Sequence, residues 1–191
     1  MGKSTKTLTE KRRAREKRTA EIFTPPWLVN KMFDTLPLDI WEEDQTVLDP
    51  ACGDGNFLVE ALTRKLKLGH NPLKALQTIF GVDIMRDNIR ECRIRLLKII
   101  GLFEPITREH IKAVFKNIVF LNRVKYPKGS LQYNFSFSET PKREDIDEWM
   151  EKINKNGIED MGLTVEEDNF EEKGDNIFFM FDNDENEDND G

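Results

Sequence analysis

The feature that most constrains the fold is a glycine-containing loop that joins a short apolar run to a helical pattern. Residues 46–49 are typical of a short buried strand, and Pro50 ends it. Gly53 and Gly55 allow a sharp turn, after which apolar residues recur at helical spacing until a stop near Gly69. A loop between the carboxyl end of a strand and the start of a helix is where doubly wound α/β sheets bind nucleotides.

The same unit repeats along the chain. Residues 78–83 predict a second strand, and the helical pattern that follows it ends at Gly101. Thr107 caps the next predicted helix, which leads into a third strand at residues 117–121. Strands that alternate with helices predict parallel pairing through right-handed crossovers, and hence a doubly wound, mostly parallel α/β sheet. A short helix over residues 27–36 precedes this region.

The regular alternation stops after the third predicted strand. Apolar and polar residues alternate from 131 to 137, as in a half-exposed strand, and one further amphipathic helix is predicted to end at Gly157. The apolar run at 177–181 is long enough for a strand. The Asp-, Glu- and Asn-rich residues 182–190 that follow are typical of a disordered tail.

Charge divides the chain into three parts. The net charge is +6 over residues 1–20, +2 over residues 21–138 and −15 over residues 139–191, within a total of −7. We therefore expect a basic arm, solvated or helical, then a folded domain, then an acidic segment with one helix, one strand and a disordered tail. The cations of the arm are candidates for nucleic-acid contact, the alternative being a solubilising or partner-binding tail. They are Lys11, Arg12, Arg13, Arg15, Lys17 and Arg18.

Composition excludes several classes of protein. No apolar run approaches the ~18 residues of a membrane-spanning helix, and the N-terminus lacks the apolar core of a secretory signal. With 2 cysteines and 2 histidines, the chain cannot build a disulfide framework or the usual four-ligand zinc site. We therefore expect a cytoplasmic protein without a metal or a membrane partner. Cys52 and Cys92 are expected to be packing residues, and both histidines are expected at the surface.

Acidic residues set the chemistry of the glycine loop. Asp83 ends the second predicted strand, where a carboxylate can accept both hydroxyls of a ribose. The loop carries Asp49 and Asp54, and it lacks the Lys-Ser/Thr pair of a phosphate-binding P-loop. The residues therefore favour a cationic nucleoside without phosphate. An ordinary strand-to-helix loop would explain the glycines, but it would not explain Asp83.

Three elements in this order resemble the S-adenosylmethionine-dependent N6-adenine DNA methyltransferases of restriction-modification type. Phe-Thr-Pro-Pro at 23–26 is similar to the family's N-terminal cofactor motif, residues 49–57 to its glycine-loop motif and residues 81–84 to its ribose-binding motif. The resemblance spans about residues 21–137. It implies a Rossmann-like methyltransferase fold, for which an incomplete sheet is one alternative, with S-adenosylmethionine as cofactor and DNA as partner in a bacterial or phage-infected cell.

The resemblance also implies roles for single residues. Thr24 and the loop at 49–55 would hold the methionine part of the cofactor, Asp83 the ribose and Ile84 the adenine. Asn122 stands where the family commonly has an Asp that binds the adenine amino group, and an amide oxygen can accept the same bond. The implied cofactor-binding residues are Phe23, Thr24, Asp49, Ala51, Gly53, Gly55, Asn56, Asp83, Ile84 and Asn122.

The family's catalytic (Asn/Asp)-Pro-Pro-(Tyr/Phe) element is absent from the sequence. That element accepts hydrogen bonds from the target amine and stacks an aromatic ring on the flipped adenine. The one Pro-Pro pair, at 25–26, belongs to the first motif. Asp182 and Asn183, which follow the apolar run at 177–181, are the remaining catalytic candidates. The alternative for these residues is an edge strand followed by an acidic tail.

These features predict an S-adenosylmethionine-binding component of a DNA adenine-N6 methylation system. Because nothing visible orients the target amine, catalysis is expected to need a second polypeptide, such as another methyltransferase subunit or a specificity subunit. A truncated relative is a further interpretation. The alternative from a different class is a catalytically inactive methyltransferase-like protein that acts on DNA or on a restriction-modification complex by occupancy.

Overall fold

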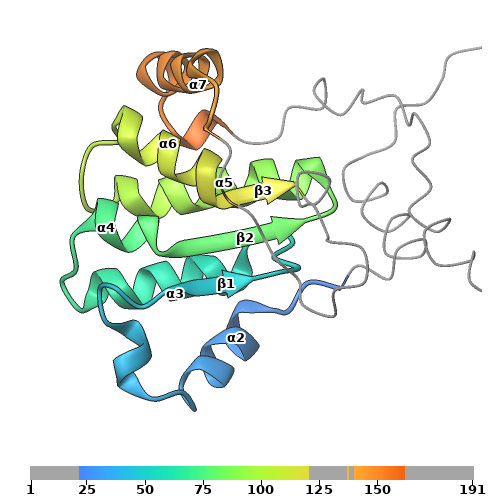
Figure 1. The fold of residues 1–191 in the computed structure, drawn as a ribbon, viewed down its shortest axis with the longest axis vertical. Helices are drawn as coiled ribbons and strands as arrows, with labels where there is room; N and C mark the ends of the chain where they lie inside the picture. Colours follow the sequence, from blue (N-terminus) through green and yellow to red (C-terminus); the bar gives the residue numbers. More distant parts are fainter. Residues whose placement is uncertain (1–21, 121–136, 138–139, 162–191) are drawn as a thin grey trace, which may run out of the picture.

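Three parallel strands lie side by side at the centre of the fold (Figure 1). The computed structural model describes residues 22–120, 137 and 140–161. The strands, in spatial order, are β1 (Val47–Asp49), β2 (Ile79–Asp83) and β3 (Ile118–Phe120). In the register, Asp49 lies opposite Gly81, and Asp83 lies opposite Phe120. The predicted parallel pairing of the three strands is confirmed.

Helices fill the connections between the strands. The first connection contains α3 (Asn56–Lys67) and α4 (Pro72–Gln77), and the second contains α5 (Arg86–Gly101) and α6 (Arg108–Asn117). The sheet is preceded by α2 (Pro26–Phe33) and the 3-10 helix η1 (Leu38–Trp41), and it is followed by α7 (Arg143–Asn156) and the 3-10 helix η3 (Glu159–Met161).

The main core lies on one face of the sheet. Ile79 and Ile118 point toward this face and are fully buried against apolar side chains of the connecting helices, including Leu58, Leu62 and Leu97. Right-handed crossovers place successive connections on the same face when the strand order runs in one direction. Within the described residues the order β1-β2-β3 runs in one direction, so the structure establishes a parallel α/β sheet of three strands.

The opposite face of the sheet carries a smaller apolar cluster. Val82 and Val119 are buried there and Phe137 packs against them. The rings of Phe80 and Phe137 meet edge-on, with centroids 4.9 Å apart. Leu48 of β1 also points to this face, and it remains 45% exposed. The expectation that the first strand is buried is therefore wrong on this side, because the main core covers only the other face of β1.

α2 differs from the helix that its apolar spacing predicts. It ends at Phe33, and Val29 and Phe33 are its buried residues. Trp27 and Met32, which belong to the predicted apolar stripe, are 67% and 46% exposed. The reason is that α2 packs mainly against α3, through one narrow face. The apolar stripe is thus wider than the face that the helix buries.

α4 is a helix that the apolar spacing does not predict. It has 6 residues, too few for a periodic pattern to stand out. Its local signals are nevertheless clear. The Asn71 side chain accepts a hydrogen bond from the Lys74 N–H at 3.0 Å, and Pro72 occupies the first turn.

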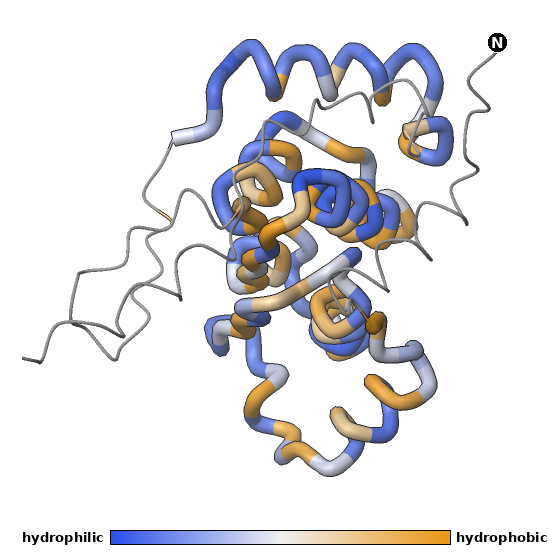
Figure 2. The backbone as a smooth tube through the Cα atoms, turned by 90° about the vertical axis from the view of Figure 1, so that its right-hand side faces the viewer, coloured by the Kyte–Doolittle hydropathy of each residue, from blue (hydrophilic) through white to orange (hydrophobic). Residues whose placement is uncertain are grey.

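α7 packs on α6 beyond the edge of the sheet. The Trp149 ring meets the Phe115 ring edge-on, with centroids 5.0 Å apart. Figure 2 shows α7 as a mostly hydrophilic helix at one end of the molecule, which agrees with its two buried residues, Ile146 and Trp149. Gly157, with a φ of +80°, ends the helix as predicted. In the described ranges no helix has the length and apolar character needed to span a membrane.

Other predicted elements lie outside the described residues. They are the basic arm at 1–20, the alternating residues 131–136, the strand at 177–181 and the acidic tail at 182–190.

Candidate functional site

A pocket of about 370 Å³ opens at the carboxyl ends of β1 and β2. Three segments bound it: the residues before α2, the glycine loop between β1 and α3, and the residues that end and follow β2. The lining residues are Ile22, Phe23, Thr24, Asp49, Pro50, Ala51, Cys52, Gly53, Asp54, Asn56, Phe57, Asp83, Ile84 and Met85. The carboxyl ends of parallel strands are the usual place for a ligand in α/β proteins.

The glycine loop is tied to both neighbouring strands. The Cys52 N–H donates to the Val82 carbonyl oxygen at 2.9 Å. On the side of β1, Asp49 Oδ1 accepts a hydrogen bond from the Ala51 N–H at 3.0 Å. Gly53 and Gly55 have φ angles of +52° and +92°, in the left-handed region that favours glycine. The loop can therefore turn into α3 while its backbone stays at the pocket wall.

Both glycines of the loop also permit close packing. A Cβ atom at Gly53 would lie 2.9 Å from the Phe23 ring, and one at Gly55 would lie 2.5 Å from Cys92 Sγ. Phe23 therefore lies directly against the pocket side of the loop, and α5 lies directly behind it. A side chain at either position would push one of these neighbours away.

Asp83 ends β2 and forms part of the pocket wall. Its Oδ2 accepts a hydrogen bond from the Gly53 N–H at 2.9 Å. Its Oδ1 accepts from the Met85 N–H at 2.7 Å and from Asn88 Nδ2 at 3.3 Å. A carboxylate offers about four lone-pair sites, so these three bonds leave room for about one more donor. A ribose bound through both hydroxyls would have to displace one of them.

The pocket carries negative charge. Burial raises the pKa of the Asp49 carboxyl above its ordinary value, and the nearby Asp83 carboxylate adds to this rise, while the Ala51 N–H opposes it. An ionised Asp49 is therefore under electrostatic strain that a positively charged ligand would relieve. The third acid of the pocket, Asp54, is paired with Arg95.

The Phe-Thr-Pro segment closes the pocket from the side of α2. The Thr24 carbonyl oxygen accepts a hydrogen bond from Asn56 Nδ2 at 2.8 Å, which joins this segment to the first residue of α3. Pro25 is the N-cap of α2 and Pro26 is its first residue. The Pro-Pro pair therefore starts a helix.

Arg95 of α5 supports the loop from outside the pocket lining. Its Nη1 donates to the Asp54 carbonyl oxygen at 2.8 Å and lies 2.9 Å from Asp54 Oδ1, and its Nη2 donates to Asn56 Oδ1 at 2.7 Å. Sequence reasoning assigned no role to Arg95. The reason is that its partners lie 41 and 39 positions away, and no local spacing reports such a contact.

The pocket brings together most of the residues implied to bind the cofactor. Those that line it are Phe23, Thr24, Asp49, Ala51, Gly53, Asn56, Asp83 and Ile84. Gly55 supports the loop through its contact with Cys92. Other candidates fall outside the described residues: Asn122, Asp182, Asn183 and the cations of the arm.

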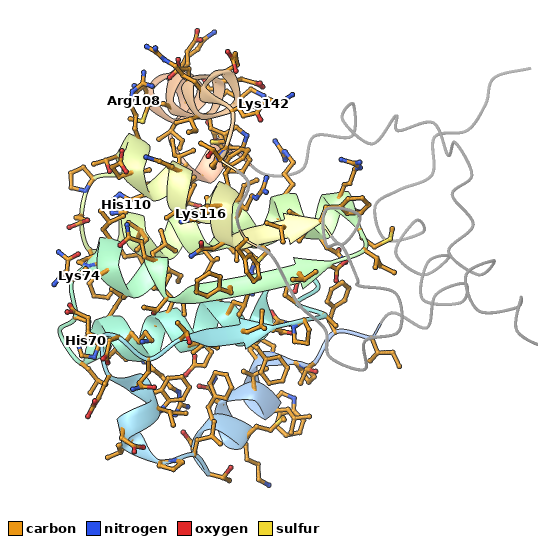
Figure 3. The ribbon with its side chains drawn as sticks, viewed as in Figure 1. His70, Lys74, Arg108, His110, Lys116 and Lys142 are labelled. Atoms are coloured by element: carbon orange, nitrogen blue, oxygen red, sulfur yellow. The ribbon has the colours of Figure 1, made fainter. Side chains whose placement is uncertain are left out.

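The two histidines lie toward the amino ends of the strands, away from the pocket (Figure 3). The prediction of a surface position is wrong for His110, which is buried in the capping box of α6. Its Nδ1 accepts from the Thr107 N–H at 3.1 Å, and its Nε2 lies 2.9 Å from Glu104 Oε1. Burial lowers the pKa of His110, although Glu104 partly opposes this. His70 Nε2 lies 2.9 Å from the Trp41 carbonyl oxygen.

Cys52 and Cys92 are free, buried thiols, as expected of packing residues. The hydrogen bond to Cys92, together with burial, raises the pKa of the Cys52 thiol. A thiol of this kind is a poor nucleophile. In the part of the chain that the structure describes, no group of three or more His, Cys, Asp or Glu side chains could hold a metal ion.

Comparison with known proteins points to one family. A family model described as N-6 DNA Methylase matches residues 6–102, which include most of the basic arm and end just after α5. The Type II methyltransferase M.VspI of Vibrio sp. (strain 343) is 37% identical over 83 residues. The matched region is 44% of this chain and 18% of that protein, so this chain spans less than a fifth of its relative. No solved structure matches the chain.

Proposed function

Because the chain belongs to the N-6 DNA methylase family, we propose that it is the S-adenosylmethionine-binding component of a DNA adenine-N6 methylation system of restriction-modification type. The observation that carries the proposal is the pocket at the carboxyl ends of β1 and β2, where all three motif segments meet.

The chemistry of the pocket fits this cofactor. S-adenosylmethionine carries a sulfonium and an ammonium group but no phosphate, and Asp49 and Asp83 provide the opposite charge. Thr24 and the backbone of the glycine loop would hold its amino-acid end. Asp83 would hold the ribose, with one bond to the protein released, and Ile84 would line the adenine site. When bound, the cofactor supplies the methyl group for transfer.

We assign the described sheet to part of a doubly wound, Rossmann-like methyltransferase domain that covers residues 21–138. A sheet of this type reverses its strand order beside its first strand, so further strands would pair along the outer edge of β1. The exposed Leu48 on that strand is consistent with additional cover.

The proposal includes a second polypeptide that supplies the catalytic element and the target recognition. Its basis is the sequence, in which the one Pro-Pro pair starts α2 and the catalytic element of the family is absent. DNA is the proposed substrate, with the basic arm as a candidate contact, and the cytoplasm is the proposed location. Asp182 and Asn183 remain the internal catalytic candidates.

Isothermal titration calorimetry of the full chain with S-adenosylmethionine tests the central proposal. We expect binding in the micromolar to millimolar range. Asp83→Ala should weaken binding by about 1–3 kcal/mol, because it removes a charged acceptor and also frees the Gly53 N–H.

Asp34→Ala is the matched control, because this carboxylate pairs with Arg64 outside the pocket. It should leave cofactor affinity within about twofold of the wild-type value, as expected for a substitution that the ligand does not touch. The absence of both binding heat and a thermal shift at millimolar cofactor would refute the proposed binding function.

A further inference from the structure

We propose that Arg95 is a positioning residue that holds the wall of the pocket around the amino-acid end of the ligand. The inference rests on the proposed function, since it assumes that S-adenosylmethionine or its product binds there. Arg95 itself is not a lining residue, but Asp54 and Asn56, which it binds, are. It would therefore act through these two residues.

The guanidinium of Arg95 contacts the end of the glycine loop and the first residue of α3 at once. Nη1 contacts both the backbone oxygen and the carboxylate of Asp54, and Nη2 contacts the Asn56 amide oxygen. The side chains of Arg95 and Asp54 are 25% and 19% exposed, so water screens this ion pair only in part. The fork of an arginine suits such a double contact, which one ammonium group cannot reproduce.

The contact with Arg95 fixes the orientation of the Asn56 amide. Because Oδ1 accepts from Arg95, Nδ2 faces the other way and donates to the Thr24 carbonyl oxygen at 2.8 Å. A chain of bonds therefore runs from α5 through α3 to the Phe-Thr-Pro segment. It joins the two sides of the pocket that are proposed to hold the amino-acid end.

Arg95 also determines which carboxylates of the pocket remain without a neutralising cation near the ligand. Its charge compensates Asp54, so that Asp49 and Asp83 are left as the acids of the lining without a cationic partner among the described ion pairs. Without Arg95, Asp54 and Asn56 would no longer be held in place beside the amino-acid end of the ligand. The loss should therefore affect ligands with an amino-acid group and spare those without one.

A pair of ligands separates this role from a general structural one. S-adenosylhomocysteine and 5′-methylthioadenosine share the adenosine and the thioether, but only the first has the amino-acid group. We expect Arg95→Met to weaken the binding of S-adenosylhomocysteine about tenfold or more in calorimetry of the full chain, because Asp54 and Asn56 lose the partner that positions them. The affinity for 5′-methylthioadenosine should change by about twofold or less, because the Asp83 side of the pocket is untouched.

Two further variants complete the test. Arg95→Lys should recover part of the S-adenosylhomocysteine affinity, since it keeps the charge near Asp54 but loses the fork. Arg93→Met is the matched control on the same helix, where the guanidinium bonds to the carbonyl oxygens of Ile118 and Phe115. It should lower the melting temperature without changing the ratio of the two affinities.

Equal weakening of both ligands by Arg95→Met, or no weakening of either, would overturn the positioning role. If Arg95→Met does not fold, the same ratio is measured for Arg95→Lys and Asn56→Ala, and an unchanged ratio in both overturns the role. A wild-type chain that binds neither ligand refutes the proposed function itself, and this result differs from all of those above.

Discussion

Asp49 and Asp83 end neighbouring strands, and both carboxylates reach the same pocket. Their positions follow from parallel pairing, which brings the carboxyl ends of β1 and β2 to one edge. Burial, with a smaller contribution from the nearby Asp83 carboxylate, makes the ionised state of Asp49 unfavourable, and this is the cause of its raised pKa. At the residue scale, an ionised Asp49 therefore lowers the stability of the empty protein and would attract a cationic ligand.

Asp49→Asn tests both the effect on stability and the effect on ligand binding. A carboxyl group with a higher pKa in the folded than in the unfolded chain stabilises the fold below its unfolded pKa and loses that contribution as pH rises through the folded value. At pH 7.5 the ionised Asp49 thus opposes folding. The substitution should raise the free energy of unfolding at pH 7.5, and this gain should vanish as the pH falls below the ordinary pKa of an Asp, as measured by urea denaturation.

The same substitution should weaken S-adenosylmethionine binding by about fivefold or more at pH 7.5, because it removes an opposite charge from the cationic ligand. Asp39→Asn, in the exposed part of η1, is the control and should alter neither quantity. A destabilised Asp49→Asn protein, or one with stronger cofactor binding, would contradict the electrostatic account.

The sequence predicted the pocket residues better than it predicted their contacts. Asp83 and the glycines stand at the ends of recognisable strands and helices, so their convergence follows from the fold class. The bonds of Asp83 to Gly53 and of Arg95 to Asp54 join distant positions, and no residue pattern contains that information. The surface position predicted for His110 was wrong for a related reason. A residue in the first turn of a helix is usually exposed, and the sequence does not show that other residues cover this one.

At the scale of elements, the glycine loop and α5 are packed without spare volume. Gly55→Ala should destabilise the fold by about 2–4 kcal/mol, because the alanine would have a strained φ of +92° and its Cβ would lie 2.5 Å from Cys92 Sγ. Gly69→Ala is the matched control. Its φ is +85° but no atom lies within 4 Å of the added Cβ, so about 1–2 kcal/mol of backbone strain is expected.

Urea denaturation of both alanine variants measures the difference. If Gly55→Ala lost no more stability than Gly69→Ala, the inferred close packing of Gly55 against Cys92 of α5 would be wrong.

Whether a helix could be predicted from the sequence depended on its length and on its N-cap residues. α3, α5 and α6 are long enough for apolar periodicity to mark them, and α6 has the predicted Thr107 cap. α4 is too short for periodicity, and only Asn71 and Pro72 signal it. The exposure of Trp27 and Met32 depends on how much of α2 a neighbour covers, which local sequence does not specify.

At the scale of the whole molecule, we propose that cofactor binding and methyl transfer are separable. A site that holds the cofactor without orienting the target amine leaves the barrier to transfer high. We therefore predict that the purified chain alone, incubated with S-adenosylmethionine and unmethylated DNA, forms no N6-methyladenine detectable by mass spectrometry of the nucleosides.

Should activity occur, Asp182→Ala or Asn183→Ala should abolish it without changing cofactor affinity. Activity that survives both substitutions, or that persists in a chain truncated after Thr140, would contradict the proposed division between binding and catalysis.

We propose above all that the pocket between the glycine loop and the end of β2 binds S-adenosylmethionine. An NMR titration of the ¹⁵N-labelled chain with the cofactor tests it most directly, because backbone amides report the position of the ligand. We expect concentration-dependent shifts for the amides of Ala51, Gly53 and Met85, which belong to the pocket lining. Unshifted amides at these positions under saturating cofactor, or shifts confined to α6 and α7, would contradict it.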